Sequence, residues 1–144
     1  MLSGLLSGLV LTSCSGAVPL DPPDPPVNAE ACSQLMAQLP ETVDGQSPRD
    51  TDPSSGLTAA YGDPAITVRC GVPDPAALTP AAQLFTVNNV DWFPEQQPDG
   101  YVFTSYRRQT NVEVTVPDDY SPESEALTAL SDVVKETVAP RAEN

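Results

Sequence analysis

The apolar residues of this 144-residue chain recur with helical spacing near both ends. A first helix is predicted over residues 29–39, with Asn28 as its N-cap and Pro40 at its end. Its apolar face, at positions i, i+3, i+4 and i+7, comprises Cys32, Leu35, Met36 and Leu39. A second helix is predicted to open at Ser121-Pro122-Glu123, with proline at the first helical position. Its apolar stripe comprises Leu127, Leu130, Val134 and Val138.

Between these helices, apolar and polar residues alternate as they do in half-buried strands. A strand is predicted over residues 65–70, where the apolar side comprises Ile66, Val68 and Cys70. Three further segments are rich in aromatic and β-branched residues and are also expected to be strands, namely residues 84–93, 101–108 and 112–116. Pro98-Asp99-Gly100 predicts a hairpin turn, and the composition of residues 41–56 indicates a loop.

These elements predict an α+β fold. We expect a small antiparallel sheet of about four strands, with the N-terminal and C-terminal helices packed on one face. Cys32 and Cys70 both fall on the apolar faces of their elements. A disulfide between them would join the first helix to the inner face of the sheet.

The chain opens with a short apolar run over residues 2–11, which closes with Leu11-Thr12-Ser13-Cys14. This is the pattern of a bacterial lipoprotein signal, although residues 1–13 contain no Lys or Arg. Cys14 would carry the lipid, with acyl chains such as palmitate, and plain secretion is the alternative. We therefore expect a signal peptide over residues 1–13, a Pro-rich tether over 14–28, one domain over 29–140 and a tail over 141–144.

The net charge limits the classes of partner, and the cysteine count indicates the cellular compartment. The formal net charge is −14, from 20 acidic and 6 basic residues, so nucleic-acid binding is not expected. We interpret this acidic surface as one that keeps the protein soluble. The alternative interpretation is that it binds a cationic partner or Ca²⁺. Three cysteines are present, so lipid on Cys14 would leave one pair, which would be oxidised outside the cytoplasm.

The sequence offers little chemistry for catalysis. There is no histidine, which excludes Ser-His-Asp and Cys-His nucleophile pairs and removes the commonest zinc ligand. Residues 50–61 resemble a calcium loop only in part, because the twelfth position is Tyr61 instead of Glu. Paired acids such as Asp118-Asp119 are better explained as helix caps. We expect no cofactor, no metal and no catalytic residue.

The scarce basic residues are the candidates for ligand binding. Arg69 and Arg107, with the aromatic residues Trp92, Tyr61 and Tyr106, would line a pocket for an anionic or saccharide ligand. The alternative is that the arginines neutralise acids and the aromatic residues pack in the core.

Several local patterns resemble one family of small exported actinobacterial lipoproteins, classed as a domain of unknown function. They are the lipobox ending at Cys14, Cys32 with Leu39-Pro40, Tyr61-Gly62-Asp63-Pro64, Val68-Arg69-Cys70-Gly71-Val72, Val90-Asp91-Trp92, Tyr106-Arg107 and Val112-Glu113-Val114. The resemblance implies an envelope location and a Cys32–Cys70 disulfide. It implies no activity, ligand or catalytic residue.

Three functions are left open. The first is a non-enzymatic protein anchored by lipid to the outer face of the bacterial cell membrane, which binds or supports another envelope component. The second is a binder of a small anionic or saccharide ligand. The third is a cell-wall hydrolase, which would require a carboxylate pair about 5–9.5 Å apart in a cleft.

Overall fold

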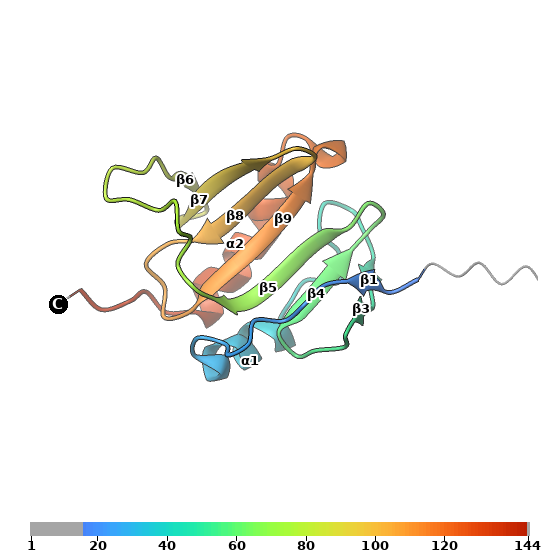
Figure 1. The fold of residues 1–144 in the computed structure, drawn as a ribbon, viewed down its shortest axis with the longest axis horizontal. Helices are drawn as coiled ribbons and strands as arrows, with labels where there is room; N and C mark the ends of the chain where they lie inside the picture. Colours follow the sequence, from blue (N-terminus) through green and yellow to red (C-terminus); the bar gives the residue numbers. More distant parts are fainter. Residues whose placement is uncertain (1–15, 144) are drawn as a thin grey trace, which may run out of the picture.

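The computed structural model describes residues 16–143, which are organised around one large antiparallel sheet (Figure 1). Its strand order is β2-β4-β5-β9-β8-β7-β6. The seven strands are, in that order, Pro48–Arg49, Thr58–Tyr61, Ile66–Val72, Asn111–Pro117, Gly100–Ser105, Val90–Gln97 and Phe85–Val87. Two short strands, β1 (Val18–Pro19) and β3 (Thr51–Asp52), pair in parallel as a separate sheet.

Two helices cover one face of the large sheet, and the N-terminal segment crosses part of the other face. Helix α1 (Ala29–Ala37) packs against β5 and α2, and α2 (Ser124–Thr137) packs against β6, β7 and β9. Figure 1 shows both helices behind the strands, and the short helix η1 (Asp118–Tyr120) precedes α2. The core between these layers is made of apolar residues with almost no exposed surface, including Leu35, Ile66, Val68, Trp92, Val114, Leu127 and Leu130. Among the described residues, no helix has the length and apolar character needed to span a bilayer.

The prediction of an α+β fold with about four strands is wrong. The protein is mostly β, because seven strands form the large sheet and two more form the small parallel one. Four of the strands that were missed or merged contain only two to four residues. Such segments are too short to display a period-two pattern, and residues 41–56 contain two of them where a loop was expected.

The segment 84–93, predicted as one strand, is a hairpin. Asn88 and Asn89 both adopt positive φ angles, 47° and 65°, and turn the chain from β6 into β7. Positive φ at both central residues is the geometry of a type I′ turn, which asparagine tolerates better than most residues. The turn was missed because Asn-Asn lies inside an otherwise apolar run and lacks the glycine that usually marks such turns.

Residues 16–27, which we call the N-terminal strap, lie against the domain instead of extending freely from it. The backbone N–H groups of Val18 and Leu20 donate to Asp50 and Asp52 (2.8 and 3.0 Å), and Val27 N–H donates to Gly71 (2.9 Å). The strap crosses the face of the sheet opposite the helices, in front of β4 in Figure 1. Most of the segment predicted as a tether therefore packs as part of the domain.

Gly71 allows the end of the strap to approach β5. Its φ of 96° is one that glycine adopts readily and other residues rarely adopt. At this position the register with β9 shifts, between Cys70 and Val72. A Cβ atom at this position would lie 3.0 Å from the Cβ of Pro26, closer than side chains normally come. The glycine after Cys70 thus provides both the bulge in β5 and the room for the strap.

The Cys32–Cys70 disulfide is confirmed. It joins α1 to β5 across 5.6 Å between Cα atoms, and neither cysteine has exposed surface. The bridge closes a loop of 38 residues. On the chain-entropy model, closing such a loop stabilises the folded state by about 4 kcal/mol.

Reduction of this disulfide is expected to lower the melting temperature by more than about 10 °C, because the unfolded chain regains the entropy that the bridge removes. Thermal unfolding followed by circular dichroism, with and without reductant, measures the shift. The Cys32→Ala/Cys70→Ala variant is the control and should melt at the reduced temperature in both buffers. An identical melting temperature for the native protein in both buffers would contradict the stabilising role.

Candidate functional site

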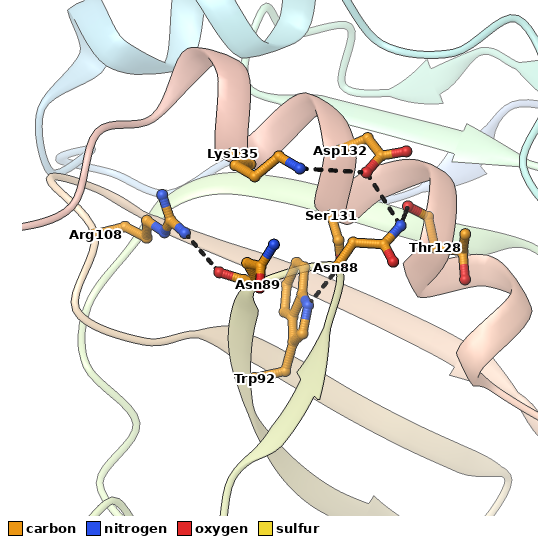
Figure 2. A network of polar contacts seen from close by, with 8 residues as sticks. All are labelled: Asn88, Asn89, Trp92, Arg108, Thr128, Ser131, Asp132 and Lys135. Carbon is orange, nitrogen blue, oxygen red and sulfur yellow. Dashed lines mark hydrogen bonds and ion pairs between the residues drawn. The ribbon is translucent and has the colours of Figure 1, made fainter.

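The structure does not bring all of the predicted ligand residues together. Trp92 is fully buried in β7, and its indole Nε1 donates to Ser131 Oγ on α2 at 2.9 Å (Figure 2). Tyr61 is 3% exposed at the end of β4, and its hydroxyl donates to the Pro40 carbonyl at 2.8 Å. Burial raises the pKa of the Tyr61 phenol, and both aromatic residues belong to the core.

Arg69 holds two layers of the fold together. Its Nη1 donates to Glu113 Oε1 on the neighbouring strand β9 at 2.9 Å, and the two side chains are 29% and 21% exposed. Its Nε donates to the Asp21 carbonyl of the N-terminal strap at 2.9 Å. The guanidinium therefore links β5, β9 and the strap, and it lies apart from the surface cavity that contains Arg107.

Arg107 lies at a cavity of about 680 Å³ at the C-terminal end of the domain. Its guanidinium lies 5.2 Å from the centre of the Tyr106 ring, within the range of a cation–π contact. Its Nη1 pairs with Glu143 at 2.7 Å. The remaining walls include Asp74 and Leu78 from the loop after β5, and Arg141 from the tail.

The C-terminal tail completes this cavity because it is fixed to the segment after β8. Arg141 N–H donates to the Arg107 carbonyl at 2.7 Å, and Gln109 N–H donates to the Ala139 carbonyl at 2.9 Å. The Arg141 guanidinium lies 3.7 Å from the Asp74 carboxylate. Residues 141–143, predicted only as a tail, thus line a cavity that collects two of the six basic residues around an open volume.

This arrangement suits an anion. Guanidinium groups bind carboxylates and phosphates through paired hydrogen bonds, and the flat face of Tyr106 supports one of them. The Arg107 and Glu143 side chains are 61% and 79% exposed. An ion pair at such a surface contributes about 0–1 kcal/mol, so an external anion can compete with Glu143 for Arg107.

Arg108, which was not a candidate, is the buried arginine of the pair. Its side chain donates to the Val138 carbonyl at 3.0 Å. It also donates to the Asn89 carbonyl at 3.3 Å, as Figure 2 shows. Desolvation lowers the pKa of the Arg108 guanidinium, and the charge of Asp91 opposes that shift. In an Arg-Arg pair after a strand, no sequence signal distinguishes the buried residue from the exposed one.

The same network fixes the β6–β7 turn onto helix α2. Asn88 Nδ2 donates to Asp132 Oδ1 at 3.1 Å, and Asp132 lies 4.0 Å from Lys135 Nζ (Figure 2). Trp92 and Ser131 lie beneath these surface contacts. The polar cluster around α2 is therefore structural, and its buried members are satisfied by one another.

Within residues 16–143, no group of three or more Cys, Asp or Glu side chains is arranged to hold a metal ion. Asp118 and Asp119 form the exposed turn η1, before the start of α2. The predictions for residues 1–13 and for Cys14 concern a part of the chain that lies outside the described residues.

The fold and the site define a small, mostly β protein with a buried disulfide and an arginine-lined surface cavity. The chain belongs to the family described as "Protein of unknown function (DUF3515)", whose model matches residues 13–142. No curated protein and no solved structure matches the chain. The family match covers the strap, the sheet, both helices and the first two residues of the tail.

The Ser131→Ala substitution is expected to destabilise the protein by about 1–3 kcal/mol, because the buried indole N–H of Trp92 loses its acceptor. Chemical denaturation followed by fluorescence of the single tryptophan measures the change. Thr128→Ala, on the exposed face of the same helix, is the matched control and should stay within about 0.5 kcal/mol of the native value. Equal stabilities for the two variants would show that the hydrogen bond is not important.

Arg69→Ala and Arg107→Ala are expected to differ sharply in stability. Loss of Arg69 leaves the half-buried Glu113 carboxylate and the Asp21 carbonyl without their donor, at a cost of about 1–3 kcal/mol. Loss of Arg107 removes a surface ion pair and should change stability by less than about 0.5 kcal/mol. Parallel denaturant titrations compare the two, and a larger loss for Arg107→Ala would reverse these assignments.

Proposed function

We propose that this chain is a lipid-anchored, non-enzymatic protein of a bacterial envelope, held on the outer face of the cell membrane, where it binds or supports another envelope component. The observation that carries the proposal is the fully buried Cys32–Cys70 disulfide. Structural disulfides form and persist in oxidising compartments and are rare in the cytosol. The bridge therefore favours a location outside the cytoplasm.

The lipid anchor is supported by sequence. Leu11-Thr12-Ser13-Cys14 closes an apolar run of the length found in export signals and offers one thiol for acylation. The pairing of Cys32 with Cys70 leaves Cys14 as the third and unmatched cysteine of the chain. The similarity to exported actinobacterial lipoproteins points to the same anchor and to an actinobacterial envelope.

A non-enzymatic role is supported by how the reactive side chains are used. The chain has no histidine, and Cys32 and Cys70 are bonded to each other. In the cavity, each of the two carboxylates is paired with an arginine, Glu143 with Arg107 and Asp74 with Arg141. A glycosidase needs one carboxyl group as acid and another as nucleophile or base, and these pairings favour binding over that chemistry.

A second candidate function, binding of a small anion, is favoured by the Arg107 cavity. Two guanidinium groups and one aromatic face border an open volume large enough for a small organic ligand. The ligand chemistry would be a carboxylate or phosphate group that replaces Glu143 on Arg107. The candidate pocket thus retains Arg107 and Tyr106 from the sequence hypothesis and replaces its other members.

Crosslinking in living cells tests the leading proposal. A tagged full-length protein is expected to stay with the membrane, to carry acyl groups on Cys14, and to capture one defined envelope component. Membrane fractionation, mass spectrometry of the N-terminal peptide and identification of the crosslinked species provide the three readouts. The Cys14→Ala variant is the control and should lose both the membrane association and the captured component.

Two results would change the proposal. A native protein without acyl groups on Cys14 would contradict the lipid anchor. Capture of a wall precursor or another anionic small molecule, lost in Arg107→Ala, would make ligand binding the leading function.

A further inference from the structure

The start of the N-terminal strap is fixed beside a turn of the sheet by one arginine. Arg49 on β2 donates from Nη2 to the Gly16 carbonyl at 2.8 Å and from Nη1 to the Gly62 carbonyl at 2.9 Å. The same Nη1 lies 3.8 Å from the carboxylate of Asp63, whose side chain is 91% exposed. The first described residue of the chain is therefore held next to the β4–β5 turn.

The strap is held along its length and not at one point alone. After Gly16, the β1–β3 pairing fixes Val18 and Leu20, and the side chain of Arg69 holds the Asp21 carbonyl. At the far end, Val27 N–H bonds Gly71. Because these contacts are spread over three strands of the domain, the strap cannot lift away without breaking all of them.

This geometry leaves almost no spacer before the domain. Cys14 precedes Gly16 by two residues, and consecutive Cα atoms are 3.8 Å apart, so the two Cα atoms lie within about 8 Å of each other. A free proline-rich segment over residues 19–26 would instead extend about 3.1 Å per residue and keep the domain well clear of the membrane.

We infer that the strap seats the domain directly on the bilayer, with the Gly62-Asp63 turn facing the lipid headgroups and the Arg107 cavity facing away. This inference rests on the lipid anchor at Cys14 proposed above. In Figure 1, β1 and the start of the strap lie toward one end of the long axis, and the C-terminal tail that lines the cavity lies at the other. The cavity is thus presented to wall-side ligands or partners and not to lipid headgroups.

Charge does not explain this orientation. Asp50, Asp52 and Asp63 lie exposed near the start of the strap, and anionic headgroups would repel them. The covalent anchor and the strap must therefore hold this end at the membrane. The surface that faces the lipid is therefore set by the covalent link to Cys14, because Cys14 precedes Gly16 by only two residues.

Site-specific photocrosslinking tests the orientation in the full-length protein. A benzophenone amino acid replaces either Asp63, beside the start of the strap, or Thr79, in the cavity wall; both positions are exposed. After irradiation of intact cells, lipid adducts are quantified by mass spectrometry. We expect several-fold more lipid adduct at position 63 than at position 79, because only the first lies within reach of the headgroups.

Two further variants separate the strap from the anchor. In the first, a flexible Gly-Ser spacer between Ser15 and Gly16 leaves every described contact intact and should reduce the adduct at position 63 to the level at position 79. In the second, Arg49→Ala combined with Arg69→Ala releases the strap and should equalise the two positions, provided that circular dichroism shows a folded domain.

The outcomes distinguish this inference from the proposed function. Equal yields at both positions, or a higher yield at position 79, in a protein with acylated Cys14 would overturn the orientation and leave the anchor in place. A yield at position 63 that is insensitive to the spacer would also overturn it. Absence of lipid adducts at both positions, with an unmodified Cys14, would overturn the anchor and the orientation together.

Discussion

Two neighbouring residues of β5 connect the layers of this protein. Because side chains alternate along a strand, Cys70 points to the inner face and Arg69 to the outer face. Cys70 bonds Cys32 and thereby fixes α1, while Arg69 bonds Glu113 and the Asp21 carbonyl and thereby holds the strap. The next residue, Gly71, bonds the end of the strap through its carbonyl. Strand β5 therefore organises both faces within three residues, and it also fixes where the N-terminal strap lies.

Most of the few basic residues of this acidic chain donate hydrogen bonds to its own backbone carbonyls. Arg49, Arg69 and Arg108 each donate to at least one main-chain carbonyl that belongs to a distant segment. A guanidinium is suited to this role because it presents several donors in a fixed plane and keeps its charge. These contacts join the strap, the sheet, the β6–β7 turn and the end of α2 without requiring more apolar core. Arg107 differs because its guanidinium is exposed and its one ion-pair partner lies in the terminal tail.

Elements with a long, local pattern of apolar and polar residues could be predicted from the sequence. The first helix, the longer strands and the disulfide could be predicted because periodicity extends over several residues and marks the inner face. Strands of two to four residues carry no such signal, which explains the error in fold class and in the number of strands. The strap was misread for another reason. A proline-rich segment is extended whether or not a surface lies beside it, and only the tertiary contacts of Arg49, Arg69 and Gly71 decide the matter. Likewise, the pocket could not be predicted, because nothing in the sequence shows which of Arg107 and Arg108 points outward.

Under the proposed lipid anchor, the strap at the start of the domain and the cavity at its far end would together limit where the protein can meet a partner. A domain on a long flexible tether samples a large volume, so its partner can lie anywhere within the reach of the tether. Under the lipid anchor proposed above, a domain held by Arg49 and the β1–β3 pairing would meet a partner only at a height above the membrane set by the length of the domain. Because the β5 contacts hold the strap and the C-terminal tail completes the cavity, the fold itself determines that height and the direction in which the cavity opens. Such fixed placement would support the binding function proposed above.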